Sequence, residues 1–505
     1  MRSLHFPSSL RAPSFLALLA IFAVAVASTG CDSRFEDVND NPNEPKEVTP
    51  NLLLPDIIRG SVNTSVNTAH TTGNLVLQYT AKVSFATEID RYNWAGVGYW
   101  QPLYGDLRNV EDMIQIAQER GQPQYEGVGL VLKSWIFSML TNAYGDVPYS
   151  ESVAVQEGIE TPKYDRQEAI YRGMLADLRR ANELLTPGSG SIQGDILYNG
   201  DLMKWKKLAN SLRLRLLMRL SEKNITLDLE GGDVSVSEAF QSITSAPETA
   251  PVFTSNDDNA ALEYLDSRPN EWPRHTSRIG TFRTFRLSET LTDTLKHFDD
   301  PRLSVFGDPT AASVEDGTPK FVGVPNGLTN DASDGFNGGR DFQSGLNFTR
   351  YYEEPDAAKG LIMTYAEVLF LKAEAVEMDW ISADAQTHYR EAIEASFEQY
   401  GQSSPPGYFG QEGVSYPASD SEQALEQIRT QKWIALFYTG LEGWFNWRRT
   451  GIPDIDPSVE NVNGDEIPVR FRYPESEQSL NADNYQAALD RQGDDDINTE
   501  MWLLE

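Results

Sequence analysis

The sequence has only one cysteine and five histidines among its 505 residues. A lone cysteine cannot form an internal disulfide, so Cys31 is either a free thiol or a modified residue. The histidines lie in no HExxH, HxH or Cys/His spacing, so the familiar zinc-site patterns are missing. No GxSxG motif is present, and no second cysteine could act as a nucleophile. We therefore expect no catalytic residues and no metal site.

Long hydrophobic runs are missing beyond the N-terminus. No stretch of about 18 apolar residues follows residue 30, so nothing after it is expected to span a bilayer. The formal net charge is −33 at pH 7, and so acidic a surface repels phosphate backbones, which argues against a nucleic-acid partner. A hydrophobic content of 40% with 22 Phe, 21 Tyr and 10 Trp is typical of a globular chain.

The first 50 residues are predicted to form an export signal followed by a tether. Arg2 and Arg11 precede an apolar run over 15–27 and the small residues Ser28, Thr29 and Gly30, which predicts a signal peptide over 1–30. Thr-Gly-Cys at the cleavage point resembles a bacterial lipobox, although Ser28 stands where leucine is usual. This resemblance implies that Cys31 is lipidated and that the membrane is reached through this anchor only. Residues 31–50, rich in Asp, Asn, Glu and Pro, are predicted to be the tether.

Helical periodicity dominates two parts of the remaining chain. We expect a helical scaffold over about 51–225 and 355–450, with an irregular part over about 226–354 where Gly, Pro, Asn and Asp accumulate. The predicted helices cover residues 74–85, 101–118, 126–144, 165–185, 201–220, 288–298, 361–380 and 382–400. In the last pair, small residues at Ala373, Ala385 and Ala392 fit the tetratricopeptide pattern of close helix contact. The fold class is therefore mostly α, with stacked helical hairpins.

The stretch QKWIALFYTGLEGWFNWRRTGIP over 431–453 is predicted to be a structural centre. Its helix should be buried on nearly all sides and end at Gly440, with a second break at Gly443. Trp444 and its aromatic neighbours should then pack against Arg448 and Arg449.

Two charged patterns allow a functional interpretation as well as a structural one. Arg213, Arg215 and Arg219 could form a phosphate patch, but on an acidic protein we expect them to pair with carboxylates. Residues 330–341 partly resemble a calcium loop, with Asp334 and Asp341 at ligand positions, but Ala332 occupies another ligand position. Calcium is thus a weak possibility, and no cofactor is predicted.

Several motifs together resemble the SusD/RagB family of outer-membrane nutrient-binding lipoproteins. The central stretch 431–453 is joined in family order by NAYGDVPY, KWKKLANSLRLRL, DPRL and TYAEVLFLKAEA. The resemblance implies a right-handed tetratricopeptide-like scaffold with an irregular, ligand-facing part packed on it, all within one domain over 51–505. It also implies a lipid-anchored, surface-exposed outer-membrane protein that passes a glycan or other oligomer to a SusC-like TonB-dependent transporter.

Family members generally place their ligand site where the irregular part meets the loop after the early helices. That loop, 86–100, is rich in glycine and aromatic residues, and aromatics outside a helix are freer to face solvent. Because sugar rings stack on aromatic faces while Arg and Asn donate to hydroxyls, we expect a stacking surface there. The candidate ligand-binding residues are Arg91, Tyr92, Asn93, Trp94, Tyr99, Trp272 and Phe282, with Trp94 and Trp272 as platforms.

Three alternatives stay open at this point. A surface-anchored glycoside hydrolase would use a carboxylate pair, although 75 acidic residues make such pairs uninformative. The ligand could be a peptide and not a glycan. The chain could also be a purely structural helical-repeat adaptor.

Overall fold

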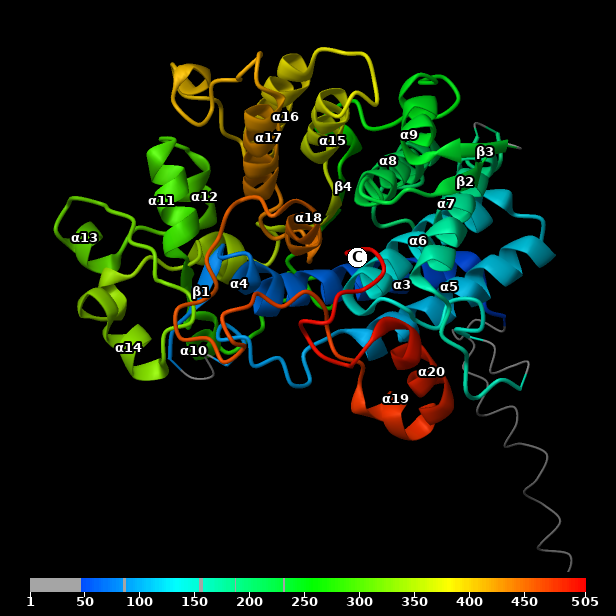
Figure 1. Cartoon of the computed structure of the whole chain (residues 1–505), viewed down its shortest axis with the longest axis horizontal. Coiled ribbons are helices and arrows are strands. Elements are labelled where there is room, and N and C mark those ends of the chain that lie inside the picture. Colours follow the sequence, from blue (N-terminus) through cyan, green and yellow to red (C-terminus); the bar gives the residue numbers. More distant parts are fainter. Residues whose placement is uncertain (1–46, 85–87, 154–157, 187, 230–231) are drawn as a thin grey trace, which may run out of the picture. The chain divides into compact units, whose positions relative to one another are not determined.

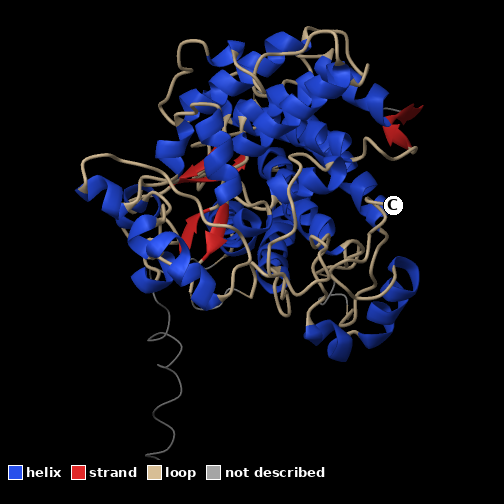
Figure 2. Ribbon diagram, turned by 60° about the vertical axis from the view of Figure 1, so that its left-hand side comes forward, coloured by secondary structure: helices blue, strands red, loops and turns tan. Residues whose placement is uncertain are grey.

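Helices build most of the protein, as Figures 1 and 2 show, and its strands form three two-stranded sheets within the described part of the chain. The structure is a computed structural model that describes residues 47–84, 88–153, 158–186, 188–229 and 232–505. Residues Thr49–Glu505 form one compact unit. The predicted signal peptide, Cys31 and nearly all of the tether lie outside the described residues. Within the described ranges, no helix combines the length and the apolar character needed to cross a membrane.

The first long helix was missed by sequence analysis. It runs over α3 (Pro50–Thr68), a π-helical turn η1 (Ala69–Gly73) and α4 (Asn74–Val76). The prediction of a helix over 74–85 is wrong beyond α4, because Gln78 has a left-handed φ of 52° and the chain then enters strand β1 (Thr80–Lys82). This strand pairs antiparallel with β5 (Phe285–Leu287), a partner that local periodicity cannot reveal.

The next four helices confirm the prediction closely. They are α5 (Trp100–Glu119), α6 (Pro123–Tyr144), α7 (Gln167–Leu184) and α8 (Leu202–Arg219). Helix α6 is the most enclosed: between Gly127 and Tyr144 every residue except Lys133 is buried. The carboxylate of Asp201 caps α8 by accepting from the backbone N–H groups of its first turn. Asp165, by contrast, does not cap α7 but accepts from the backbone N–H groups of Tyr149 and Ser150.

The C-terminal scaffold contains α15 (Tyr365–Glu377), α16 (Ala385–Gln399), α17 (Ser421–Ala435) and α18 (Glu442–Thr450). The predicted helix over 361–380 begins late, because Lys359–Met363 is strand β6, paired with β4 (Ala260–Glu263). Helix α17 ends at Ala435, before Gly440, and Gly443 lies inside α18, so both predicted breaks are misplaced. Gly451 ends α18 in the left-handed conformation, as expected. The hairpin of α15 and α16 and the earlier antiparallel pairs make the fold a tetratricopeptide-like scaffold.

The part between β2 and β6 is a set of short elements and no long helix. In chain order these are β2 (Thr226–Leu229), β3 (Gly232–Ser235), α9 (Val236–Thr244), η3 (Asn256–Asp258), β4, α10 (Ile279–Phe282), β5, α11 (Glu289–His297), α12 (Arg302–Phe306), α13 (Ala311–Glu315), α14 (Asn330–Gly335), η4 (Phe336–Gly338), η5 (Arg340–Phe342) and η6 (Thr349–Glu353). Two further helices, α19 (Glu475–Leu480) and α20 (Ala482–Gln492), follow the scaffold.

The segment that resembled a calcium loop does not have that geometry. Residues Asn330–Gly335 are helical, and the carboxylate of Asp334 accepts from Arg340 Nε at 2.6 Å. A guanidinium therefore lies where a cation would have to approach. Within the ranges that the structure describes, no three His, Cys, Asp or Glu side chains are grouped to hold a metal ion.

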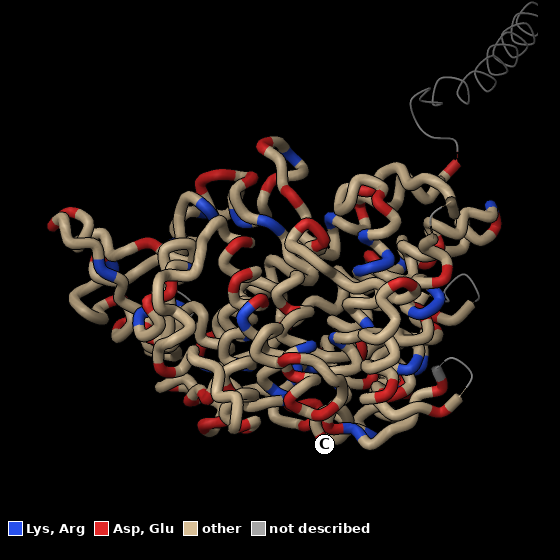
Figure 3. Tube along the Cα trace, turned by 90° about the horizontal axis from the view of Figure 1, so that it is seen from above, with Lys and Arg blue, Asp and Glu red and all other residues tan. Residues whose placement is uncertain are grey.

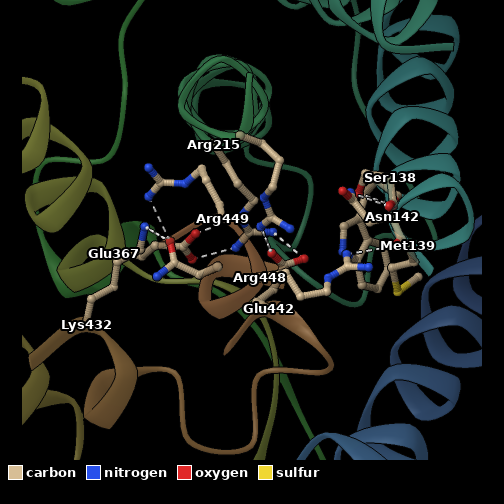
Figure 4. Close-up of polar contacts among 12 residues, drawn as sticks. Ser138, Met139, Asn142, Arg215, Glu367, Lys432, Glu442, Arg448 and Arg449 are labelled. Carbon is tan, nitrogen blue, oxygen red and sulfur yellow. Dashed lines mark hydrogen bonds and ion pairs between the residues drawn. The ribbon is translucent and has the colours of Figure 1, made fainter. Parts of the chain in front are cut away.

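A network of buried charges joins the helices of the scaffold (Figure 4). Arg215 of α8 pairs with Glu367 of α15 at 2.5 Å, and Arg219 pairs with Glu442 of α18 at 2.6 Å. The expectation that these two arginines bind carboxylates is thus confirmed. Arg213 donates to the side-chain oxygen of Asn210 at 3.1 Å.

The two arginines before Gly451 connect α18 to different helices. Arg448 Nη2 donates at 2.6 Å to the backbone oxygen of Asn142, in the last turn of α6, and its guanidinium lies 4.3 Å from the Trp444 ring centroid. Arg449 Nη2 donates at 2.7 Å to Glu374 of α15. The Arg-Arg pair therefore holds three helices together, which is a structural reason for this motif.

Candidate ligand-binding surface

The aromatic residues expected to form a stacking surface are buried, which corrects the sequence prediction. Trp94 is 3% exposed, and its ring packs edge-on against Trp444 at 5.5 Å and Phe471 at 5.4 Å. Its indole Nε1 donates to the backbone oxygen of Ile89 at 3.1 Å. A ring enclosed in this way has no free face for a sugar.

The other predicted aromatics have structural partners as well. The Tyr99 hydroxyl donates to the backbone oxygen of Met139 at 2.7 Å, and the Tyr92 hydroxyl accepts from the backbone N–H of Ser458 at 3.0 Å. Trp272 is 1% exposed and donates from Nε1 to the backbone oxygen of Tyr351 at 2.9 Å. The prediction that these side chains face solvent is therefore wrong.

Phe282 is buried too, beside Tyr352 with ring centroids 4.9 Å apart. The glycines of the 86–100 loop explain why rings there turn inward. A Cβ at Gly98 would overlap the Tyr144 hydroxyl, so the loop backbone lies directly on the core and its aromatics fold back into it.

Asn93 is the one predicted residue that is both exposed and placed in a cavity. We name this cavity the threonine groove; its volume is about 420 Å³, and it is lined by Thr68, Thr71, Thr72, Glu88, Ile89, Asn93 and residues 95–98. Arg91 is half-buried nearby and donates from Nε to the backbone oxygen of Glu460 at 2.7 Å. The binding roles of Asn93 and Arg91 stay predictions.

The π-helical turn η1 forms one wall of the threonine groove. Thr71 and Thr72 line the groove, while His70 of the same turn points into the core. The His70 ring lies 4.0 Å from the Phe285 ring centroid, and Nδ1 lies 2.5 Å from the Tyr438 hydroxyl. Burial, with the positive charges of Arg274 and Lys82, holds the pKa of His70 well below its usual value. The imidazole is therefore neutral and shielded from solvent, and it cannot serve as an acid or base for a ligand in the groove.

Sequence analysis did not identify the threonines of this groove. The segment NTSVNTAHTTGN over 63–74 has few apolar residues, so it offers no amphipathic stripe and was not predicted to be helical. A dense run of hydroxyl and amide side chains beside a predicted binding loop is the signal that could have pointed to them. Such groups donate to and accept from sugar hydroxyls, and the groove volume falls within the usual range of small-molecule sites.

A second cavity of about 320 Å³ lies on the irregular part. Its lining includes three arginines, Arg283, Arg286 and Arg340, and the rings of Phe282 and Phe348. We name it the arginine cavity. It contrasts with the sequence as a whole, in which 75 Asp and Glu residues, red in Figure 3, outnumber 42 Lys and Arg residues, blue in the same view.

A larger cavity, of about 660 Å³, lies elsewhere, between the segment before α8 and the β4–β6 sheet. Its charged side chains are already engaged. Asp195 accepts from Trp205 Nε1 at 2.8 Å and from three backbone N–H groups, and Lys359 pairs with Glu263 at 2.6 Å. Because these groups stabilise the fold, size alone does not make this cavity the candidate site.

Comparisons with known proteins agree with the fold. Residues 42–474 match the family SusD-like, described as starch-binding and associating with the outer membrane. No curated protein matches the sequence. Among solved structures, a SusD homologue from Bacteroides fragilis is 30% identical, with a TM-score of 0.78 over 91% of this chain and 100% of the other.

Two further structures are similar over nearly the whole chain. A second SusD homologue from Bacteroides fragilis is 26% identical with a TM-score of 0.76, over 91% of this chain and 100% of the other. A chitin-binding protein is 28% identical with a TM-score of 0.74, over 90% of this chain and 98% of the other.

Proposed function

The chain belongs to the SusD-like family, and from this premise we propose that it is a lipid-anchored cell-surface protein that binds a glycan and delivers it to a SusC-like TonB-dependent transporter. The family's starch binding and outer-membrane association make it a nutrient-binding outer-membrane protein. Similarity over 90% of the chain to a chitin-binding protein supports a glycan as the ligand, and a peptide is the alternative within the family.

The observation that carries the glycan assignment is the threonine groove. The Asn93 amide, the Glu88 carboxylate and three threonines line a space that a few sugar residues could fill. The hydroxyls of Thr68 and Thr71 already donate to backbone oxygens one helical turn earlier, so they can only accept from a ligand. Hydrogen bonding of this kind needs no catalytic group. We therefore propose that the protein binds its ligand without cleaving it.

We predict that Asn93→Ala weakens glycan binding without changing stability. Asn93 is exposed, so its amide is available to a ligand and contributes little to the core. Loss of one hydrogen bond corresponds to about 0.5 to 1.5 kcal/mol, or roughly a twofold to 13-fold loss of affinity. Calorimetric titration with maltooligosaccharides and chitooligosaccharides measures this effect.

Asn224→Ala is the matched control, because Asn224 is also an exposed asparagine but lies between α8 and β2, outside the groove. It should bind as the wild type does. Equal affinities of the Asn93 variant and the wild type would remove the threonine groove from the proposal.

We predict that Cys31→Ala releases an intact, folded protein from the membrane. The several acyl chains of a bacterial lipoprotein bury enough methylenes, at about 0.8 kcal/mol each, to hold a protein stably, and the variant lacks their attachment point. Fractionation of cells that lack the transporter measures the effect. If the variant still sediments entirely with membranes, the proposed anchor is wrong.

A further inference from the structure

The arginine cavity is built on the edge of the small β1–β5 sheet. Strand β5 forms a bridge from Arg286 to Gly345, and Gly307 forms a second bridge to Leu346, so three separate segments meet at one edge. A Cβ at Gly345 would lie 3.1 Å from Arg286 Nη1, so the glycine leaves room for the guanidinium. In the view of Figure 1, α10, α13 and α14 lie on the same side of the molecule as β1.

Two of the three arginines are held in place by their surroundings. Arg340 donates from Nε to Asp334 at 2.6 Å and also contacts the Ser84 hydroxyl. The guanidinium of Arg283 lies 5.2 Å from the Phe348 ring centroid, in a cation–π contact at the mouth of the cavity. These contacts orient positive groups toward a shared space before any ligand arrives.

Arg286 lacks contacts of this kind: within the described ranges, no carboxylate or aromatic ring holds its guanidinium in the way that Asp334 holds Arg340 and Phe348 holds Arg283. Its Nε is buried without a hydrogen-bond partner, and none of the residues that the structure describes forms an ion pair with it. Burial, together with the charges of Arg340 and Arg283, lowers the pKa of Arg286 to about 10, against the opposing effect of the Asp341 and Asp334 carboxylates. A guanidinium that is partly desolvated and faces like charges gains free energy when an anion binds to it.

The acidic groups of the lining, Asp308 and Asp341, offset this positive charge only in part, because three arginines line the same cavity. Asp308 accepts from the backbone N–H of Phe348 at 2.8 Å, and burial raises its pKa. Asp341, the other acidic residue of the lining, is exposed, and Asp334, which lies outside the lining, pairs with Arg340. On a chain with a formal net charge of −33, an arginine-rich concavity is therefore a local exception.

The aromatic rings beside the arginines restrict the classes of ligand that fit the cavity. Phe348 is half-buried and stacks on Tyr352 with ring centroids 5.1 Å apart. Arg283 lies over this ring as well, so Phe348 offers a ligand its ring edge. An apolar ring edge beside guanidinium groups suits a ligand with both a C–H surface and an anionic substituent. An acidic sugar residue has this combination.

We infer that the arginine cavity binds the anionic group of an acidic glycan, either the carboxylate of a uronic acid or a sulfate ester. This inference rests on the proposed function and specifies its ligand class. Arg286 and Arg283 would donate charge-assisted hydrogen bonds to the anion, and Phe348 would contact the ring that bears it.

The test is calorimetric titration of the soluble protein with three probes: an oligogalacturonate, a sulfated carrageenan oligosaccharide and a neutral maltooligosaccharide. The first two probes separate the carboxylate from the sulfate ester. We expect Arg286→Gln to weaken binding of the preferred acidic probe by about 10- to 100-fold, since hydrogen bonds to charged groups are among the strongest. Binding of the neutral probe should change less than about twofold.

Arg283→Gln tests the same inference at an exposed position, where the substitution leaves the core intact. The matched control is Arg472→Gln, an exposed arginine outside the cavity that should bind as the wild type does. If only the neutral probe binds, or if both cavity variants bind the acidic probes as the wild type does, the inference is wrong while the proposed function stands. If no glycan binds at all, the proposed function fails and the inference fails with it.

Discussion

Replacement of Glu374 by alanine is expected to destabilise the protein by about 3 to 5 kcal/mol. The Glu374 side chain is fully buried, and its Oε1 accepts from Arg449 at 2.7 Å and Arg429 at 2.9 Å, while Lys432 Nζ lies 3.9 Å from Oε2. Without this carboxylate three cations would be left close together in the interior, part of which Figure 4 shows. Urea unfolding measures the change. Glu426→Ala, at an exposed position of α17, is the control and should change stability by less than about 0.5 kcal/mol.

The same residue gives a pH dependence with a defined sign. Burial alone would raise the pKa of Glu374, but Arg449, Lys432 and Arg429 hold it at about 2, against 4.5 for a free glutamate. The stability that its charge contributes is therefore full above about pH 4.5 and is lost as the pH falls toward 2. The difference in unfolding free energy between the wild type and Glu374→Gln should shrink over this window. A difference that stays constant from pH 6 to pH 2 would contradict the assignment.

Replacement of Trp444 by alanine should also lower the free energy of unfolding by about 3 to 5 kcal/mol, because it removes a large, fully buried ring from the core. Trp444 is 1% exposed, stacks on Phe471 at 5.3 Å and donates from Nε1 to the backbone oxygen of Pro468 at 2.8 Å. Trp94 packs against it from the loop. Chemical unfolding with fluorescence detection measures the loss.

Trp447→Ala is the comparison for this experiment, because Trp447 lies in the same helix but is only partly buried. Trp447→Ala should lower the free energy of unfolding clearly less than Trp444→Ala does. A Trp444 variant that unfolds at the wild-type denaturant concentration would show that the ring is not part of the core.

Elements with regular apolar spacing could be predicted from the sequence, and elements defined by distant partners could not. Helices α5 and α7 have apolar residues along one face, and α6 and α8 have them around most of the helix. The ranges of these four helices could therefore be predicted from the spacing of apolar residues. Strand β1 pairs with a strand some 200 residues later in the chain, and strand β6 likewise pairs with the distant β4. Both were predicted to be parts of helices, because a short apolar run looks the same in either structure.

The candidate site depends even more strongly on contacts between residues that are far apart in the sequence. The loop that the sequence pointed to lines the threonine groove through Asn93, but the sequence could not give the direction of the rings. Trp94 turns inward because Trp444 and Phe471, more than 300 residues away in the chain, surround its ring. The stretch from Trp272 to Arg286 contains aromatic rings interleaved with arginines, and only the fold separates their roles. Arg274 donates to Asn67 at 3.0 Å, whereas Arg286 reaches the arginine cavity.

The central claim is that this protein binds a glycan and does not cleave it. The most direct measurement incubates the soluble protein with neutral and acidic oligosaccharides and with peptides, and records both equilibrium binding and new reducing ends. We predict saturable binding of at least one oligosaccharide, no binding of peptides and no increase in reducing ends. Release of new reducing ends, or binding of peptides alone, would contradict the account.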